Sequence, residues 1–261
     1  MILIHGIYTN MNYSLENFLQ NISSKKKVLF LTTSNRWEGS KEIPKSTLLA
    51  RSIKEKISDT TEVTILDVPS LKIFPCEGNV SGVDGNNCGV KDSILKDTDK
   101  NPSGYHRCWA SLNNPQDELW KISKEMFESD AVIFFISVRW GQANAFYQKL
   151  IERLNWIENI HTTLGEDNFI SDIQAGCVVV GQNWNGESVL ETQKQVYEFY
   201  GFQVPDELSF YWQYTQDTLD ETQESYKEAP KAFVDEFDLS ISSLKESLKR
   251  SLRNLKRLFE F

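Results

Sequence analysis

A chain of 261 residues with 40% hydrophobic and 12% aromatic residues can bury a full core, which excludes an intrinsically disordered protein. Its formal net charge of −9 argues against general nucleic-acid binding, because such binding needs a basic surface that neutralises phosphates. No apolar run is long enough to cross a bilayer. From the length of 261 residues we expect one large domain, or one domain with extensions.

The opening residues and the cysteines indicate the compartment. The stretch MILIHGIYTNMNYSLENFLQ has neither a positive n-region nor a long apolar h-region, so a secretory signal is not expected. The four cysteines are widely spread, unlike those of a disulfide framework: Cys76, Cys88, Cys108 and Cys177. Both observations predict a cytoplasmic protein.

Strands and amphipathic helices alternate along most of the chain. Apolar runs predict strands at residues 28–34, 62–68, 130–138, 175–183 and 207–214. Apolar residues at helical spacing predict helices at 46–57, 117–129, 145–160 and 186–201. This alternation, with strands apolar on both faces, predicts an α/β fold with a doubly wound, five-stranded parallel sheet.

Three segments fall outside this alternation. Residues 1–26 are predicted to be an N-terminal extension, which can add a strand or an arm, and residues 216–261 a C-terminal helical extension of a domain at 27–215. Within the domain, residues 69–115 are rich in Gly, Asn, Asp, Ser and Lys. A connection of this length inside a domain is usually functional or disordered.

A basic amphipathic helix is expected near the C-terminus. Four leucines share one of its faces, among lysines and arginines: Leu244, Leu248, Leu252 and Leu255. We expect this face to pack on the domain or on a second subunit. Binding to an anionic membrane surface is the alternative.

The loop after the first strand, residues 32–50, offers hydroxyl groups and positive charges. Its hydroxyl and cationic side chains are Thr32, Thr33, Ser34, Arg36, Lys45, Ser46 and Thr47. Ser46 and Thr47 open a helix, where free backbone N–H groups and the helix dipole favour an anion such as phosphate. A capped helix after a polar loop is the alternative. The loop matches neither the Walker A pattern nor G-x-G-x-x-G.

A guanidinium, a large ring and a glycine stand together after the third strand, in Arg139, Trp140 and Gly141. Gly141 lets the backbone approach a ligand, Trp140 can lie against a ring, and the amides of residues 139–144 can bind the edge of a heterocycle. The alternative is that Trp140 plugs the end of the core.

The loop after the fourth strand, residues 180–189, combines amides with an aromatic ring. Gly181 and Gly186 bracket the sequence Gln-Asn-Trp-Asn before another helix. A turn with a helix cap explains this loop alone. Ligands of doubly wound sheets bind beyond the carboxyl ends of the strands, so three such loops on one rim favour a binding site.

These residues resemble the flavodoxin-like NAD(P)H-dependent FMN reductases, a family that includes the iron–sulfur flavoproteins, over roughly residues 27–215. The best stretch is ISVRWGQANAFYQKLIERL, which is similar to the family's strand, SP-x-Y/W-(G/N) loop and following helix. The positions in step with that segment are Ser137, Trp140, Gly141, Lys149, Leu150, Ile151, Glu152 and Arg153.

The resemblance implies a flavodoxin-like fold that binds FMN. In such a fold the first loop would cradle the phosphate, the second would wrap the isoalloxazine ring, and the third would also contact the flavin. The predicted cofactor-binding residues are Ser34, Arg36, Ser46, Thr47, Ser137, Val138, Arg139, Trp140, Gly141, Gln142, Asn144, Gly181, Asn183, Trp184 and Gly186.

The chain also departs from the family pattern. Val138 replaces the family's proline, and the phosphate loop carries an apparent insertion, WEGSKEIPK. Cys76 and Cys88 are too far apart, and Cys108 too isolated, for the short spacings that an iron–sulfur cluster or zinc requires. We therefore expect no metal.

The implied activity is FMN-dependent oxidation of NADH or NADPH, with transfer to a small acceptor such as a quinone, a nitro or azo compound, or free flavin. The flavin carries the chemistry, so no catalytic side chain is assigned. The segment 101–114 can form a lid, from which His106 is a hypothetical proton donor and Arg107 could meet a phosphate. Surface packing of this loop or a dimer contact is the alternative.

Two alternatives remain open: an electron carrier without enzymatic activity, and a cofactor-free scaffold. An enclosed substrate site would favour the enzyme, whereas an open flavin edge would favour the carrier. We also expect a homo-oligomer, either a dimer or a tetramer.

Overall fold

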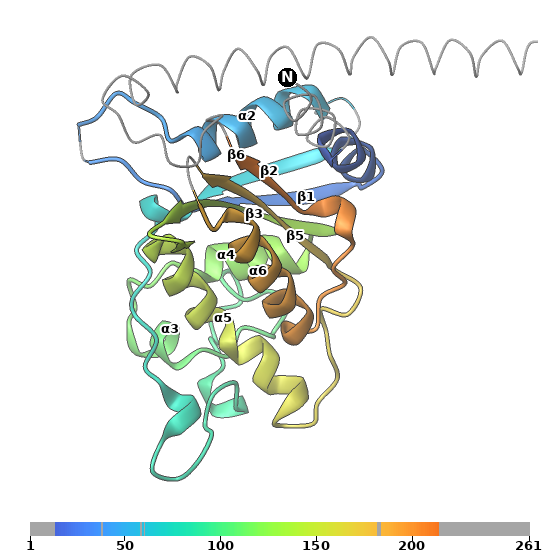
Figure 1. Cartoon of the computed structure of the whole chain (residues 1–261). Coiled ribbons are helices and arrows are strands. Elements are labelled where there is room, and N and C mark those ends of the chain that lie inside the picture. The colour runs from blue at the N-terminus through green and yellow to red at the C-terminus, as the bar shows by residue number, and fades with distance from the viewer. Residues whose placement is uncertain (1–13, 38, 58, 60, 182–183, 214–261) are drawn as a thin grey trace, which may run out of the picture.

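Parallel strands in the order β2-β1-β3-β5-β6 form the central sheet. The computed structural model describes residues 14–37, 39–57, 59, 61–181 and 184–213. The strands are β1 (Lys27–Thr32), β2 (Glu62–Asp67), β3 (Ala131–Arg139), β5 (Gln174–Gly181) and β6 (Phe210–Gln213). The predicted flavodoxin-like, five-stranded parallel sheet is confirmed (Figure 1).

Central strands of this sheet are apolar on both faces because helices cover both. β1 pairs in parallel with β2 and β3, so that Val28 lies beside Val63 on one side and Ala131 on the other. The first six residues of β3 are all buried. This burial explains why the strands appear in the sequence as continuous apolar runs rather than alternating ones.

Two details of the strands differ from the prediction. A two-residue strand, β4 (Gln142–Ala143), turns back on β3 and pairs with it antiparallel. The stretch expected as a strand at 207–214 begins instead with the 3-10 helix η4 (Asp206–Leu208), which follows Pro205, and β6 starts only after it.

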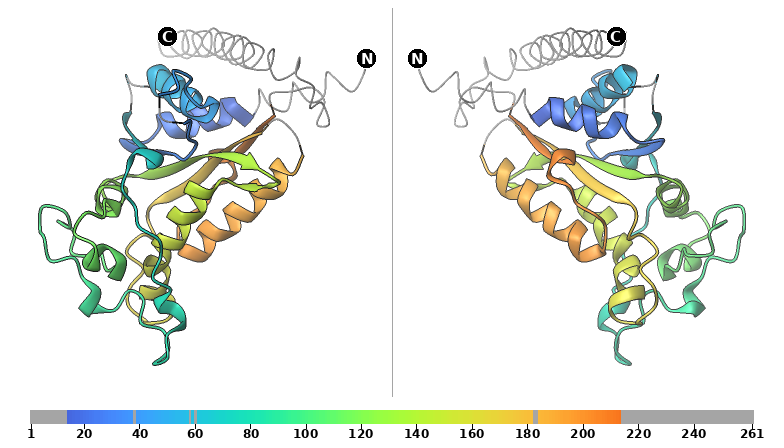
Figure 2. Two further views of the ribbon diagram at one scale, coloured as in Figure 1. Left: turned by 90° about the vertical axis from the view of Figure 1, so that its left-hand side faces the viewer. Right: turned by 90° about the vertical axis from the view of Figure 1, so that its right-hand side faces the viewer.

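Helices cover the two faces in two layers (Figure 2). On one face lie α2 (Lys45–Ile57) and a helix at residues 14–23. The opposite face carries α4 (Leu119–Phe127), α5 (Ala145–Thr162) and α6 (Gly186–Tyr200). Each layer has its own hydrophobic cluster, and the sheet separates the two.

The helix at residues 14–23 lies in the segment that was predicted to be an N-terminal extension. It buries four side chains against the sheet: Leu15, Phe18, Leu19 and Ile22. The ring of Phe18 meets that of Phe210 edge-on, with 5.2 Å between centroids. The boundaries at 26/27 and 215/216 remain predictions, and the predicted basic C-terminal helix lies outside the described residues.

Between β2 and α4 the chain makes a long insertion. It contains short helical turns at η1 (Val68–Ser70), η2 (Asn79–Ser81) and η3 (Lys91–Ser93), followed by the helix α3 (Trp109–Asn113). The insertion descends along α5 to the lower end of the molecule in Figure 1. Within the described part of the chain, no helix has both the length and the apolar character needed to cross a membrane.

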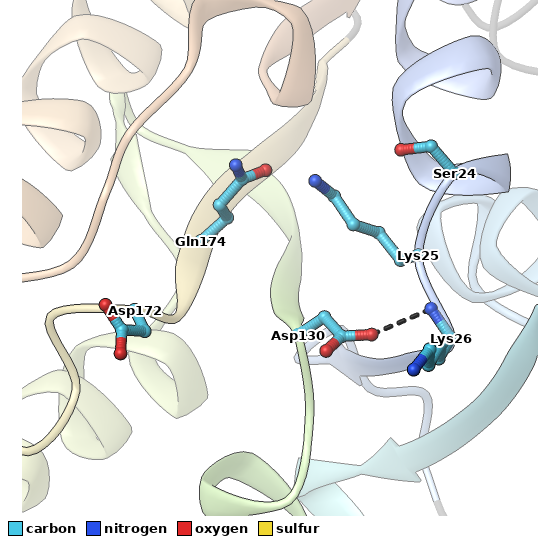
Figure 3. Close-up of a pocket in the computed structure, with 6 residues that line it drawn as sticks. All are labelled: Ser24, Lys25, Lys26, Asp130, Asp172 and Gln174. Carbon is cyan, nitrogen blue, oxygen red and sulfur yellow. Dashed lines mark hydrogen bonds between the residues drawn. The ribbon is translucent and has the colours of Figure 1, made fainter.

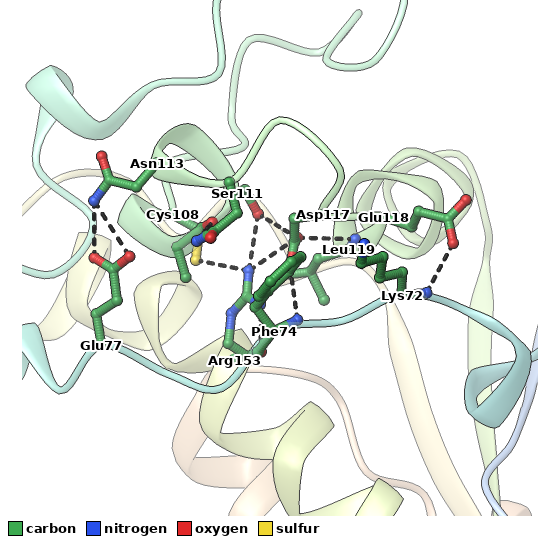
Figure 4. Close-up of polar contacts among 12 residues, drawn as sticks. Lys72, Phe74, Glu77, Cys108, Ser111, Asn113, Asp117, Glu118, Leu119 and Arg153 are labelled. Atoms are coloured by element: carbon green, nitrogen blue, oxygen red, sulfur yellow. Dashed lines mark hydrogen bonds and ion pairs between the residues drawn. The ribbon is translucent and has the colours of Figure 1, made fainter.

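Arg153 of α5 anchors this insertion from within (Figure 4). Its guanidinium donates to the Asp117 carboxylate at 2.7 and 3.0 Å, to the carbonyl of Phe74 and to the hydroxyl of Ser111. Both partners of the ion pair are fully buried. Burial raises the pKa of Asp117, but the hydrogen bonds from Arg153, the backbone N–H of Phe74 and Ser111, together with the charge of Arg153, bring the pKa below its ordinary value.

Candidate functional site

The carboxyl ends of β1, β3 and β5 meet at one edge of the sheet, which we call the rim. Because the three strands are parallel and adjacent, the loops that follow them leave from the same edge. These loops span residues 33–44, 140–144 and 182–185, of which residues 38, 182 and 183 lie outside the described structure.

Three buried hydroxyl groups gather where the first loop enters α2. Ser34, Ser46 and Thr47 are each at least nine-tenths buried. The Ser46 hydroxyl donates to that of Ser34 at 2.7 Å, whereas Oγ1 of Thr47 has no hydrogen-bond partner among the described residues. A buried hydroxyl without a partner costs stability, so the position suits a ligand oxygen that accepts its proton.

Positive charge surrounds these hydroxyls. Burial lowers the pKa of Lys45, and the positive charges of Arg36 and Arg139 lower it further. Nε of Arg36 is buried and forms an ion pair with a carboxylate oxygen of Glu42 at 3.6 Å, too far for a hydrogen bond. Three neighbouring cations beside the first turn of a helix favour an anion, and a phosphate is the group that best matches them.

The second loop is a tight hairpin with a strained tip. Val138 pairs with Ala143, and Arg139 with Gln142, which leaves Trp140 and Gly141 as the two turn residues. Both have positive φ, 50° and 69°, as a two-residue hairpin turn of type I′ requires. This conformation is uncommon for a tryptophan.

Trp140 projects outward from this hairpin and is 93% exposed. The alternative expectation that it plugs the core is therefore wrong. Strain that holds a large apolar ring in solvent is typical of a functional site rather than of a structural turn.

Asn144 joins the hairpin to the first loop. Its Nδ2 donates to Thr33 Oγ1 at 2.9 Å and to Ser137 Oγ at 3.3 Å, while its Oδ1 caps α5 by accepting from the backbone N–H of Tyr147. Thr33 in turn donates to the carbonyl of Phe135 on β3. Both ends of the Asn144 amide are thus engaged inside the chain, which makes it a positioning residue for the two loops.

The third loop packs directly on the hairpin. Nδ2 of Asn185 donates to the Gly141 carbonyl at 2.6 Å. A Cβ at Gly141 would lie 2.8 Å from the ring of Trp184, and one at Gly186 would lie 2.1 Å from the ring of Tyr211. These close approaches explain the glycines. Asn183 lies outside the described residues.

The structure therefore brings most of the predicted rim residues onto three adjoining loops. Ser137, Val138 and Gly181 lie at the last residues of β3 and β5, and a Cβ at Gly181 would meet Val138 at 3.3 Å. Asn185 was not among the predicted site residues. Its φ of 71° and its bond to the hairpin became visible only in three dimensions.

The segment 101–114 does not cover the rim. It packs around the far half of α5, where His106 is buried against the ring of Trp156, with 5.1 Å between centroids. Arg107 pairs with Glu166, which follows the end of that helix. The predicted lid is wrong because the insertion runs along α5, away from the strand ends.

His106 is also unsuited to donate a proton to a ligand at the rim. Its Nδ1 lies 2.6 Å from the hydroxyl of Ser123, inside the core. Burial, together with the positive charge of Arg153, lowers the pKa of His106 to about 3. The imidazole is therefore neutral at physiological pH and enclosed by protein.

A hollow of about 320 Å³ lies at the opposite edge of the sheet, near the amino ends of the strands (Figure 3). Lysine and aspartate side chains line it, and the Asp130 carboxylate accepts from the backbone N–H groups of Lys26 and Lys27 at 2.7 and 3.0 Å. Those bonds give Asp130 a structural role. Among the described residues, no three acidic, cysteine or histidine side chains are grouped to hold a metal.

Several solved structures are similar to this chain at low sequence identity. RosB, crystallised with the bound intermediate 8-demethyl-8-formylriboflavin-5'-phosphate, matches with a TM-score of 0.53 at 14% identity, over 90% of this chain and 86% of that chain. An azoreductase from Bacillus anthracis str. Sterne matches at 0.48 and 13%, over 85% and 99% of the two chains.

An NAD(P)H:quinone oxidoreductase from Methanothermobacter marburgensis matches at 0.45 and 11%, over 83% and 98% of the two chains. No family model and no curated protein matches the chain. At 14% identity, the match with RosB shows the shared fold alone.

Proposed function

We propose that the chain binds FMN at the rim and acts as an NAD(P)H oxidoreductase that reduces a small acceptor. The observation that carries this proposal is the cluster of buried hydroxyls and cations beside the first turn of α2, which adjoins a strained hairpin. The Thr47 hydroxyl has no hydrogen-bond partner among the described residues, and the Arg36 guanidinium carries positive charge beside it, so the two suit a phosphate, as in FMN.

Each loop has a distinct task in this proposal. Ser34, Ser46 and Thr47, with Arg36 and Lys45, would hold the phosphate. The hairpin at Trp140 and Gly141 would lie along the flavin ring, and Arg139 would stabilise the negative charge of its reduced form. The bound flavin would supply hydride and electron transfer, and the chain would bind, orient and tune it.

RosB supports the cofactor, because its structure holds a riboflavin 5'-phosphate derivative and its fold is the one described here. The acceptor would be a quinone, a nitro or azo compound, or free flavin, and the reductant NADH or NADPH. We propose a cytoplasmic homo-oligomer, either a dimer or a tetramer.

An electron carrier is the second candidate. It is favoured by one observation: the aromatic and basic segment 101–114 leaves the rim uncovered and Trp140 exposed. A carrier exchanges electrons through an exposed flavin edge and needs no substrate enclosure.

The test is to add FMN to the purified protein and to record its visible spectrum before and after anaerobic NADH or NADPH. Retained flavin that bleaches supports the reductase and identifies the preferred nicotinamide. Retained flavin that bleaches only with dithionite supports the carrier. Failure to retain FMN would contradict both and leave the cofactor-free scaffold.

Thr47→Val tests the phosphate site separately. Because its hydroxyl has no partner among the described residues, we expect the variant to fold at least as stably as the wild type, while FMN affinity falls about 10-fold and riboflavin affinity does not change. The control is Thr192→Val on the exposed side of α6, which should leave both affinities unchanged. Equal affinity of Thr47→Val and wild type for FMN would place the phosphate elsewhere.

A further inference from the structure

A second hollow, of about 330 Å³, lies where α5 ends. This end of the helix is in the lower part of the molecule in Figure 1. Its walls come from two segments that are far apart in the sequence. Tyr105 and Arg107 belong to the insertion, and Gly165, Glu166, Asp167 and Phe169 to the loop between α5 and β5. None of the described residues of the rim loops lines it.

One wall of this hollow is a pre-assembled aromatic platform. The ring of Tyr105 stacks on that of Phe169 with 4.3 Å between centroids and an interplanar angle of 3°. Phe127 packs edge-on against both rings, which holds them in place. Tyr105 nevertheless remains 43% exposed. A supported ring with free surface is suited to stacking with a flat ligand.

Beside the platform, a hydrogen-bond donor and an acceptor stand side by side. Nη1 of Arg107 donates to both carboxylate oxygens of Glu166 at 2.9 Å. Arg107 is more than nine-tenths buried, and its Nε has no hydrogen-bond partner among the described residues. The Glu166 carboxylate is about one-third exposed and retains lone pairs for further donors.

A ligand edge that complements this pair must present an acceptor next to a donor. The lactam edge of a flat heterocycle does so, since its C=O accepts while the adjacent ring N–H donates. Guanine extends that edge with an amino group, a second donor for the carboxylates of Glu166 and Asp167. Adenine lacks the lactam. We propose that this hollow binds a guanine base, stacked on Tyr105 with its lactam edge turned toward the paired Arg107 and Glu166.

The charge of the hollow favours a ligand without a phosphate group. Glu166 is paired with Arg107, while Asp167 is exposed and adds a negative charge. A phosphate close to the base would be repelled, so the free base or nucleoside should bind more tightly than the nucleotide.

This site is independent of the proposed flavin function. The hairpin precedes α5 and the hollow follows it, and an α-helix of 18 residues is about 27 Å long. A failure of FMN to bind would therefore leave this inference untouched, and the reverse also holds.

The test is isothermal titration of the purified full-length protein with guanosine, adenosine and guanosine 5'-monophosphate. We expect guanosine to bind at least about 10-fold more tightly than adenosine, because only guanosine matches both the donor and the acceptor. It should also bind more tightly than the monophosphate. Absence of guanosine binding, or equal affinity for guanosine and adenosine, would overturn the proposal.

Tyr105→Ala and Tyr105→Phe form the matched pair of variants. The alanine removes the platform and should weaken guanosine binding about 10-fold or more, whereas the phenylalanine keeps the ring and should retain the affinity. Circular dichroism verifies that both variants fold, and FMN binding should be the same in both. Unchanged guanosine affinity in folded Tyr105→Ala would refute the stacking.

Discussion

Single residues at the rim show how local backbone strain and hydrogen bonding hold three loops together. Asn144 uses both ends of its amide, one for the cap of α5 and the other for Thr33 and Ser137. Gly141 has positive φ and lies against Trp184. The rim therefore depends on residues that contact other loops as much as on residues that would face a ligand.

Gly141→Ala should disturb the rim more than the same change elsewhere. Its φ of 69° is strained for alanine, and the added Cβ would also push the ring of Trp184, 2.8 Å away. Gly165 has nearly the same φ, 68°, but no atom lies within 4 Å of a Cβ there. We expect Gly141→Ala to weaken FMN binding about 10-fold or more, and Gly165→Ala to leave it unchanged, in fluorescence titrations. If both variants lost FMN affinity equally, the loss would come from backbone strain and not from the contact with Trp184.

His106 should make stability depend on pH. Its pKa is about 3 in the folded chain because it is buried, and close to 6.5 when unfolded. Between these values only the unfolded chain takes up the proton, so stability is full above pH 6.5 and falls toward pH 3. The slope reaches about 1.4 kcal/mol per pH unit.

Urea unfolding at several pH values measures this slope, and His106→Asn should reduce it. Ser123→Ala keeps the imidazole buried and should retain the slope. An unchanged slope in His106→Asn would assign the pH dependence to other groups.

At the scale of elements, the helix at residues 14–23 is as much a part of the fold as the helices between strands. It completes one helical layer beside α2 and covers β6 through the contact between Phe18 and Phe210. Sequence periodicity identified the helices between strands because they recur in alternation with apolar runs. A helix that precedes the first strand lacks that context, so its place on the sheet had to come from tertiary packing.

Phe18→Ala tests this packing. The side chain is fully buried, and its removal should lower the free energy of unfolding by about 3–5 kcal/mol. Phe199→Ala deletes the same ring from a position on α6 that is 68% exposed, and should change stability by less than about 0.5 kcal/mol. Chemical denaturation gives both values. A small loss in Phe18→Ala would mean that this helix adds little to the stability of the sheet.

The whole molecule has two polar features at opposite ends of α5: the rim, with its buried hydroxyls and cations, and the hollow between Tyr105 and Glu166. The insertion links the two ends, and the buried pair of Arg153 and Asp117 holds it against the helix. A ligand at the rim should stabilise the folded chain as a unit, since the rim loops extend from the central strands.

FMN at about 100 times its dissociation constant should raise the free energy of unfolding by about 2.7 kcal/mol, and the melting temperature by about 5–10 °C. Riboflavin lacks the phosphate and should raise the melting temperature less at the same concentration. Differential scanning fluorimetry compares the two ligands. No shift with FMN, or equal shifts with both, would contradict a phosphate site at α2.

The sequence by itself determined the sheet and the location of the rim. Buried strands carry continuous apolar runs, and parallel strands place the loops that follow them at one edge. The amino-acid pattern alone therefore assigns Ser34, Arg139 and Gly181 to that edge, where the folded chain has them. These inferences depend only on local pattern and on the rules of parallel sheets.

Only the tertiary structure showed where the insertion runs and which residues the rim side chains contact. A long connection has no periodicity that says where it runs, so the burial of His106 and the pairing of Arg107 with Glu166 could not be read from residues 69–115. The engagement of Asn144 and the contact between Asn185 and Gly141 join residues 44 or more positions apart. Such contacts arise from packing between elements, and a local sequence pattern does not encode them.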